Sequence, residues 1–450
     1  MTIFHPPLRT PLILLLASCL GGCSMIPKLS SDSPGKRAFI QYWPPPEGNK
    51  QLRLGIKDNI DMKGVVTTAG SEYLDRTNRP ATEDAPCLAI ARKRNVLIVG
   101  KTNLSEFAVA PSGFNGYFGT PKSPLSGWRS LIPGGSSSGS AVAVALGVAD
   151  VTFGTDTAGS VRVPAACSGV VGLKTTHGLI SIEGIYPIEP EHMDTVGPLG
   201  KDIAHTALGM DLLEEGFAKK YAAAMAANPS AKSIRIGRLR LKGTDPRIDA
   251  AVDQALIKAG FQVVLLGKDF QKKWDDAKQD GNILATAGAW ISDRKYRGKF
   301  GISGRTKSAI LAGRIAYNRG YKKAVARQAA WQNELKTVFK QVDFIALPTM
   351  QATPLPIPVN LKIGILEARV LEQQNTVAVN FAGNPALAMP IPLRNAGVPV
   401  TSLQLVGPRN SEAQLLNAGR LVEASEKKTS SNLFWEIIEK IKFPLQASAH

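Results

Sequence analysis

Cysteine and histidine are scarce in this chain: its 450 residues include four cysteines and five histidines. Cys19 and Cys23 belong to an N-terminal leader described below, so only Cys87 and Cys167 remain for the rest of the chain. Two thiols are too few for a disulfide framework, and we expect both to be buried as small apolar residues. The histidines are scattered singly, with none of the short spacings that hold a metal ion. The sequence therefore predicts no metal site.

Carboxylates are outnumbered: 36 Asp and Glu stand against 54 Lys and Arg, for a formal net charge of +18. A charge of this size favours an anionic partner such as nucleic acid or an acidic membrane surface. The cations, however, are spread through residues 232–340, without the compact basic run and interleaved aromatics of a nucleic-acid-binding segment. We therefore expect a solvated basic surface and no nucleic-acid partner.

Long apolar runs are also missing, apart from a short one near the N-terminus. Residues 11–20 follow Arg9, are too short to cross a bilayer, and have the proportions of a signal-peptide core. The tetrapeptide Leu-Gly-Gly-Cys that ends at Cys23 resembles a bacterial lipobox, in which cleavage before the cysteine leaves that residue for lipid attachment. A similar tetrapeptide ends at Cys19, and an ordinary secreted protein with an incidental cysteine is the simpler alternative.

These features divide the chain into four parts. We expect residues 1–23 to be a lipoprotein-type signal peptide with Cys23 lipidated, and residues 24–44 to be a polar tether. Residues 45–425 form one large domain, and 426–450 a C-terminal extension. The protein is then exported, as a periplasmic or outer-membrane-associated bacterial lipoprotein.

Apolar patterns of strand and helix length alternate along residues 45–425, which is typical of a sheet covered by helices. The expected strands are 51–56, 96–100, 148–154, 233–239, 262–266, 342–347, 377–381, 386–390 and 402–406. The expected helices are 85–94, 138–147, 204–215, 249–259 and 412–424. Residues 268–340 have helical periodicity but a basic and polar composition, which predicts a helical cover outside the central sheet.

Two serines stand in Gly-rich turns that flank an apolar segment: Ser136 and, 24 positions later, Ser160. Serine is a poor nucleophile unless a base and donors for the developing oxyanion assist it. A Ser-His-Asp triad on Ser137, at the centre of a G-x-S-x-G match, is disfavoured because a loop precedes it and no histidine stands out as a partner. A phosphate-binding Walker loop needs G-K-[ST], whereas Ser140 follows Gly139 here. Tight turns of small residues are the remaining structural alternative.

Together with Lys57, these turns resemble the amidase signature family, whose members hydrolyse amides with a Ser-Ser-Lys triad. The resemblance covers about residues 45–425. It is carried by the motifs at 57–60, 100–107, 133–140, 154–164, 169–174 and 194–198. It implies a single large α/β domain with a central twisted mixed β-sheet covered by α-helices on both faces.

The resemblance also assigns roles to residues. It implies that Ser160 is the nucleophile, that Ser136 bridges, and that Lys57 is the base. A lysine shielded from water loses solvation, so its pKa falls and the neutral amine can accept a proton. In the family a cis peptide precedes the bridging serine, here the Gly135–Ser136 bond.

The turn around the nucleophile has two further implied parts. The backbone N–H groups of Thr157, Ala158, Gly159 and Ser160 would form the oxyanion hole, with Ala158 in place of a frequent glycine. Asp156 and Arg162 flank the nucleophile and would brace the turn as an ion pair, whereas His177 and His192 are expected to be structural or exposed.

The resemblance predicts an amidase that acts on linear C–N amide bonds (EC 3.5.1 type), with no cofactor. Its substrate would be a small-molecule or peptide amide, selected by the variable residues 268–340 and 348–375, and a homodimer is compatible with the family. The alternatives are an A-type amidotransferase component, an esterase on the same triad, and a catalytically silent binding lipoprotein. The leader argues against the amidotransferase, because that reaction is cytoplasmic.

Overall fold

The computed structural model describes residue 35, residues 37–358 and residues 363–429. The expected signal peptide, including Cys19 and Cys23, lies outside these described residues, as do most of the tether and residues 430–450. Within the described part, no helix combines the length and apolar character needed to cross a membrane.

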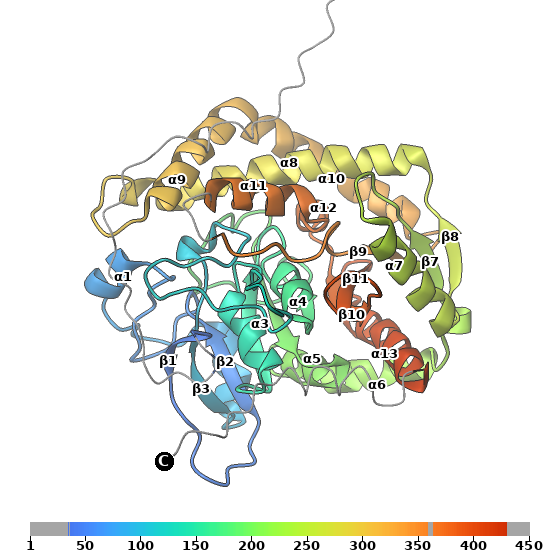
Figure 1. The fold of residues 1–450 in the computed structure, drawn as a ribbon, viewed down its shortest axis with the longest axis horizontal. Coiled ribbons are helices and arrows are strands. Elements are labelled where there is room, and N and C mark those ends of the chain that lie inside the picture. The colour runs from blue at the N-terminus through green and yellow to red at the C-terminus, as the bar shows by residue number, and fades with distance from the viewer. Residues whose placement is uncertain (1–34, 36, 359–362, 430–450) are drawn as a thin grey trace, which may run out of the picture.

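An eleven-stranded sheet runs through the molecule in the order β1-β3-β2-β4-β6-β5-β10-β11-β9-β7-β8 (Figure 1). The strands are β1 (Phe39–Tyr42), β2 (Arg53–Lys57), β3 (Leu97–Thr102), β4 (Val151–Asp156), β5 (Val171–Lys174), β6 (Thr195–Gly200), β7 (Arg235–Arg238), β8 (Gln262–Leu265), β9 (Phe344–Pro348), β10 (Ala386–Pro392) and β11 (Val400–Val406). β2 pairs in parallel with β3 and β4, as β7 does with β8 and β9, whereas β4, β6, β5, β10 and β11 pair antiparallel. The sheet is therefore mixed, as predicted.

Thirteen α-helices surround the sheet in the part of the chain that the structure describes. They are α1 (Glu72–Thr77), α2 (Ala89–Lys93), α3 (Ser138–Ala145), α4 (Arg162–Ser168), α5 (Ile203–Asp211), α6 (Phe217–Ala227), α7 (Pro246–Ala259), α8 (Lys268–Asp293), α9 (Gly304–Ala316), α10 (Lys322–Val338), α11 (Ile363–Gln373), α12 (Val377–Ala382) and α13 (Glu412–Thr429). α7 shows how local residues set where a helix begins and ends. The Asp245 side chain caps its first turn by accepting from the Arg247 N–H, and Gly260 ends the helix at φ +85°.

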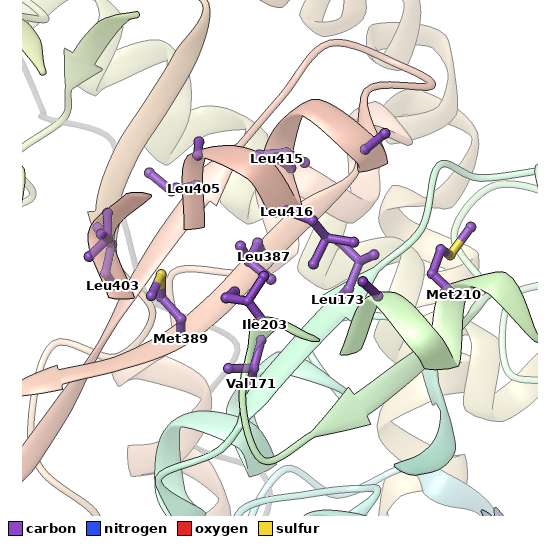
Figure 2. Packing of buried hydrophobic residues seen from close by; sticks show 14 of the residues in the cluster. Val171, Leu173, Ile203, Met210, Leu387, Met389, Leu403, Leu405, Leu415 and Leu416 are labelled. Atoms are coloured by element: carbon purple, nitrogen blue, oxygen red, sulfur yellow. The ribbon is translucent and has the colours of Figure 1, made fainter. Parts of the chain in front are cut away.

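Both faces of the sheet are covered, as two neighbouring residues of β10 show. Successive strand residues point to opposite faces. Leu387 packs with Ile203 of α5 and Leu416 of α13 (Figure 2), whereas Ala388 belongs to a separate cluster with Ala165 of α4. Each leucine buried in this way stabilises the fold by roughly 2 kcal/mol. The predicted two-sided covering of a single α/β domain is confirmed.

The basic stretch 268–340 forms α8, a 3₁₀ turn, α9, a π-helical turn at Tyr317–Tyr321, and α10. These helices lie together along one side of the molecule, above α11 and α12 in Figure 1. Trp274 and Trp331 pack edge to face, with ring centroids 5.8 Å apart, and hold α8 against α10. The expected helical cover is therefore present.

One expected strand is wrong: residues 377–381 belong to the helix α12. All six residues of α12 are buried, so no polar face shows the helical period, and a short apolar run is equally compatible with a buried strand. Tertiary contacts decide in favour of the helix, which ends at Gly383 with φ +77°.

Strand β1 falls within the expected tether of residues 24–44 but pairs with β3, so the sheet begins before residue 45. Strands β5 and β6 also have no counterpart in the sequence prediction. Each contains glycine, and β6 also contains proline, both of which are poor strand formers. A Cβ at Gly197 would lie 2.0 Å from the carbonyl oxygen of Leu173, so this glycine permits a close backbone approach that propensity alone does not reveal.

Candidate active site

Lys57 stands at the end of β2, beside the end of β4. The two strands pair in parallel, with Ile56 opposite Phe153, so the Lys57 side chain meets Thr155 at one edge of the sheet. Lys57 Nζ donates to Thr155 Oγ1 and to Ser136 Oγ, each at 2.8 Å, and the lysine is 0% exposed. Asn59 Nδ2 also donates to Thr155 Oγ1, at 3.1 Å, which fixes that hydroxyl. The structure thus brings together two of the three predicted catalytic residues.

Burial changes the acid-base character of this lysine. Loss of hydration lowers the pKa of Lys57 to about 7, although the charges of Asp156 and Asp194 partly oppose the shift. An amine with this pKa is neutral in about half of the molecules at pH 7. It can therefore act as a base, which an ordinary surface lysine cannot.

Ser136 lies in the loop that leads into α3, and the Gly135–Ser136 peptide bond is cis, as predicted. Gly134 precedes it at φ +72°, where an added Cβ would lie 2.8 Å from the Val163 carbonyl oxygen. Gly135 N–H donates to the Pro111 carbonyl at 2.7 Å, and Ser105 N–H donates to the Ser136 carbonyl at 3.2 Å. The segment 105–111, which lies earlier between β3 and α3, therefore holds the backbone of this serine.

Ser160 lies in the turn between β4 and α4 and is half-buried, whereas Ser136 is fully buried. The Ser160 carbonyl accepts a hydrogen bond from Ser137 N–H at 3.2 Å, so the two serine-bearing turns are in direct backbone contact. Gly159, at φ +134°, precedes it, and a Cβ there would lie 2.3 Å from Thr376 Oγ1. The predicted nucleophile is thus the more accessible of the two serines.

The side chain of Asp156 holds the backbone of this turn. Its carboxylate accepts from the N–H groups of Gly159, at 2.8 Å, and Val161, at 3.1 Å. It also forms a buried ion pair with Arg162, with Nη2 2.9 Å from Oδ1. Burial alone would raise the pKa of Asp156, but the Arg162 charge outweighs it and holds that pKa well below its usual range. The predicted Asp156–Arg162 ion pair is confirmed.

This geometry changes one part of the expected oxyanion hole. The Gly159 N–H is occupied by Asp156 and is not free to bind an oxyanion. Among the described residues, the N–H groups of Thr157, Ala158 and Ser160 have no hydrogen-bond partner and remain available. Gly159 contributes its positive φ and its hydrogen bond to Asp156, which together fix the shape of the turn.

Several supporting residues lie far from the motif in sequence and were not predicted. Arg162 Nη1 donates to Gln404 Oε1 at 2.8 Å, and its Nη2 donates to Asn380 Oδ1. Thr376 Oγ1 donates to the Ala158 carbonyl, and Thr157 Oγ1 donates to Asp194 Oδ1 at 2.6 Å. Asp194 had a signal in the sequence as the first residue of the motif at 194–198, and residues 380–390 and 404–407 echo the family pattern more weakly. Thr376 had no such signal.

Other sequence candidates lie outside this arrangement. Ser137 Oγ donates to the Thr155 carbonyl at 3.3 Å, and no histidine in the part of the chain that the structure describes forms a hydrogen bond with it. His177 Nε2 contacts the Pro190 carbonyl, and His192 lies 3.8 Å from Glu191. Cys87 and Cys167 are buried and unpaired, as expected.

A family model described as Amidase matches residues 52–416. The chain belongs to the amidase family. It is 33% identical to the 2-amino-5-chloromuconic acid deaminase of Comamonas testosteroni, over 83% of this chain and 81% of that protein. It is also 32% identical to the A-type component of the glutamyl-tRNA(Gln) amidotransferase of Halobacterium salinarum, over 82% of this chain and 94% of that component.

Solved structures have the same fold as this amidase-family chain. A chain from the vestigial protein complex that reveals the evolutionary origins of an s-triazine catabolic enzyme has a TM-score of 0.72 and 25% identity, over 86% of this chain and 85% of that one. The 6-aminohexanoate cyclic dimer hydrolase has a TM-score of 0.70 and 22% identity, over 83% and 85% of the two chains. The second likeness establishes the fold alone.

Proposed function

We propose that this amidase-family protein hydrolyses a carbon–nitrogen amide bond through an acyl-enzyme on Ser160. The observation that carries the proposal is the fully buried Lys57, whose Nζ lies 2.8 Å from Ser136 Oγ and whose pKa is lowered to about 7. Neutral Lys57 takes the Ser136 hydroxyl proton while Ser136 takes that of Ser160. The Ser160 oxygen then attacks the substrate carbonyl carbon.

The resulting tetrahedral intermediate has a negative oxygen, which the free N–H groups of Thr157, Ala158 and Ser160 would stabilise. Removing one such donor typically costs about 3 kcal/mol of transition-state stabilisation. Collapse of the intermediate breaks the C–N bond, and the proton returns from Lys57 through Ser136 to the departing amine. Water, deprotonated by the same relay, then attacks the ester carbonyl and releases the acid and the Ser160 hydroxyl.

We place linear amides first among substrates. Two curated relatives support C–N chemistry by their names, a deaminase and an amidotransferase component, each about one-third identical to this chain. The A-type amidotransferase role is the second candidate, because the match to that component spans 94% of its length. An esterase on the same residues would need no different geometry. A silent binding lipoprotein is disfavoured, because it would have no use for a desolvated lysine.

A hydrolysis panel tests the proposal, using protein that lacks residues 1–23. It spans short aliphatic, aryl, fatty acyl and peptide C-terminal amides, together with matched esters and glutamine. Labelling with a fluorophosphonate identifies the nucleophile in the same samples. We expect wild type to be labelled and Ser160→Ala not to be; equal labelling of the two would refute the assignment. Glutamine hydrolysis that depends on an added partner would favour the amidotransferase.

We also propose that the protein is exported and anchored to a membrane by a lipid on Cys23. The support is the leader of residues 1–23 with its lipobox-like end. Metabolic labelling with a fatty acid tests this, with Cys23→Ser and Cys19→Ser compared in the same host. Loss of label in Cys23→Ser alone is the expected result, and label retained in both variants would exclude lipidation at either position.

A further inference from the structure

A hollow of about 650 Å³ is lined by residues outside the candidate catalytic set. Its walls come from α10, from the residues that follow α12, and from two loops, and α10 packs against α12. None of Lys57, Ser136 or Ser160 lines it. The amide chemistry proposed above makes no use of this hollow.

One wall is a stripe along α10 and the turn after it. Gln328, Gln332 and Lys336 line the hollow at intervals of four residues, so they lie on one face of α10. Lys340, in the turn that follows the helix, lines the hollow as well. Both lysines are exposed. Lys336 Nζ contacts only the amide oxygen of Asn333, at 3.5 Å, so its charge has no carboxylate partner among the described residues.

Another part of the wall holds a fixed arginine, Arg409. Arg409 Nη1 donates to the Gly383 carbonyl at 3.1 Å, and its Nη2 donates to the His177 carbonyl at 2.7 Å. These two bonds orient the guanidinium against the backbone. Within the described ranges no carboxylate forms an ion pair with Arg409, so no acidic side chain neutralises its charge at the hollow.

Positive charge is therefore concentrated at this hollow. Glu191 is the only carboxylate among the described residues that line it, against three permanent cations. A neighbouring group responds to the excess: burial lowers the pKa of His177, and the charges of Lys174, Arg409 and His192 lower it further. A concave surface lined by cations that lack acidic partners attracts an anion.

We propose that this hollow binds a small free organic or phosphate polyanion with at least two closely spaced negative charges. One acidic group would pair with Arg409, and the other with Lys336 and Lys340. The glutamine side chains of the α10 stripe provide neutral hydrogen-bonding groups between them.

Isothermal titration calorimetry of the full chain with citrate and with pyrophosphate tests the proposal. NaCl is added so that both titrations have the same low ionic strength. We expect one site per chain. The double variant Lys336→Gln/Lys340→Gln should weaken binding about tenfold, since each lost charge removes an attraction at short range. Lys322→Gln/Lys323→Gln is the matched control, because it removes two charges from the same helix outside the hollow, and it should bind within about twofold of wild type.

Arg409→Gln should weaken binding in the same direction, and its thermal unfolding midpoint shows whether the loss reflects misfolding. Unlike Arg409, the side chains of Lys336 and Lys340 donate to no backbone carbonyl. The double-lysine variant therefore remains informative if Arg409→Gln fails to fold. Absence of binding by wild type, or equal affinity of the two double-lysine variants, would overturn the proposal. So would binding to phosphatidylglycerol vesicles without binding to either free anion, because it would identify a lipid surface as the ligand.

Discussion

Lys57 Nζ lies 2.8 Å from Ser136 Oγ, although 79 positions separate the two residues in the chain. The contact forms because β2 delivers the lysine and the loop before α3 delivers the serine to the same edge of the sheet. Both residues are fully buried, so the hydrogen bond forms without competition from bulk water.

Ser160→Ala should lower kcat for any substrate found in the panel by at least about 10⁴-fold, because no other hydroxyl can form the acyl-enzyme. Ser136→Ala should lower it by about 10³-fold, the range of a lost proton relay. Ser137→Ala is the matched control: the hydroxyl of this buried neighbour donates only to the Thr155 carbonyl, and the substitution keeps the backbone N–H, so activity should stay near wild type. A Ser137 variant as inactive as Ser160→Ala would point instead to the G-x-S-x-G interpretation.

Activity should rise with pH and reach half its maximum near pH 7, because burial lowers the pKa of Lys57 to about 7 and only the neutral amine accepts a proton. A pH profile of kcat/KM measures this. Lys57→Met keeps the length and removes the amine, and it should be inactive across the whole range. A profile that is flat from pH 6 to 9 would contradict the role of Lys57 as base.

The same lysine should make stability depend on pH. In the unfolded chain its amine has the ordinary pKa of 10.5, so between about pH 7 and that value the unfolded state binds more protons than the folded state. The free energy of unfolding should therefore rise with pH across this window. Lys174, whose pKa burial also lowers to about 7, contributes with the same sign. Denaturant titrations at pH 7 and 9 should show a smaller rise in Lys57→Met than in wild type.

Asp156→Asn should destabilise the fold by about 3–5 kcal/mol, because it leaves the fully buried Arg162 without its counter-charge. The turn would also lose the carboxylate that holds the Gly159 N–H, so activity should fall as well. Urea unfolding measures the first effect. Asp276→Asn, which breaks the exposed Lys272–Asp276 pair, is the control and should change stability little. Equal effects of the two variants would mean that Arg162 finds another partner.

Glu367 of α11 should influence catalysis without touching the substrate. It accepts from Ser112 Oγ at 2.6 Å and from Arg305 Nη1 at 2.7 Å, and thereby clamps the loop whose Pro111 carbonyl holds Gly135 N–H. We expect Glu367→Ala to lower kcat about tenfold or more, since small displacements of catalytic groups are costly. Glu367→Gln keeps an acceptor and should recover part of the loss. Unchanged kcat in a folded Glu367→Ala variant would show that the clamp is not needed.

Local sequence patterns predicted most of the strands and helices around the two serine-bearing turns. Both serines stand in glycine-rich turns, and the strands and helices around them have apolar runs of the right length. The helical period of residues 268–340 is clear, because its polar residues mark the exposed face. The prediction failed for α12, where every residue is buried and no polar face marks the period. It also failed for β5 and β6, whose glycines serve close backbone contacts.

By itself, the sequence determined which residues were available for chemistry: a lysine, two serines and a flanking ion pair, together with the family to which their motifs point. Only the tertiary structure decided how they act. Burial, which no local pattern records, lowers the pKa of Lys57, and long-range packing brings Asn380, Gln404 and Thr376 to the nucleophile turn. The same packing occupies the Gly159 N–H with Asp156, so the oxyanion donors are fewer than the motif suggested. Hydration, charge and backbone hydrogen bonding depend on neighbours in space, and these are distant in the chain.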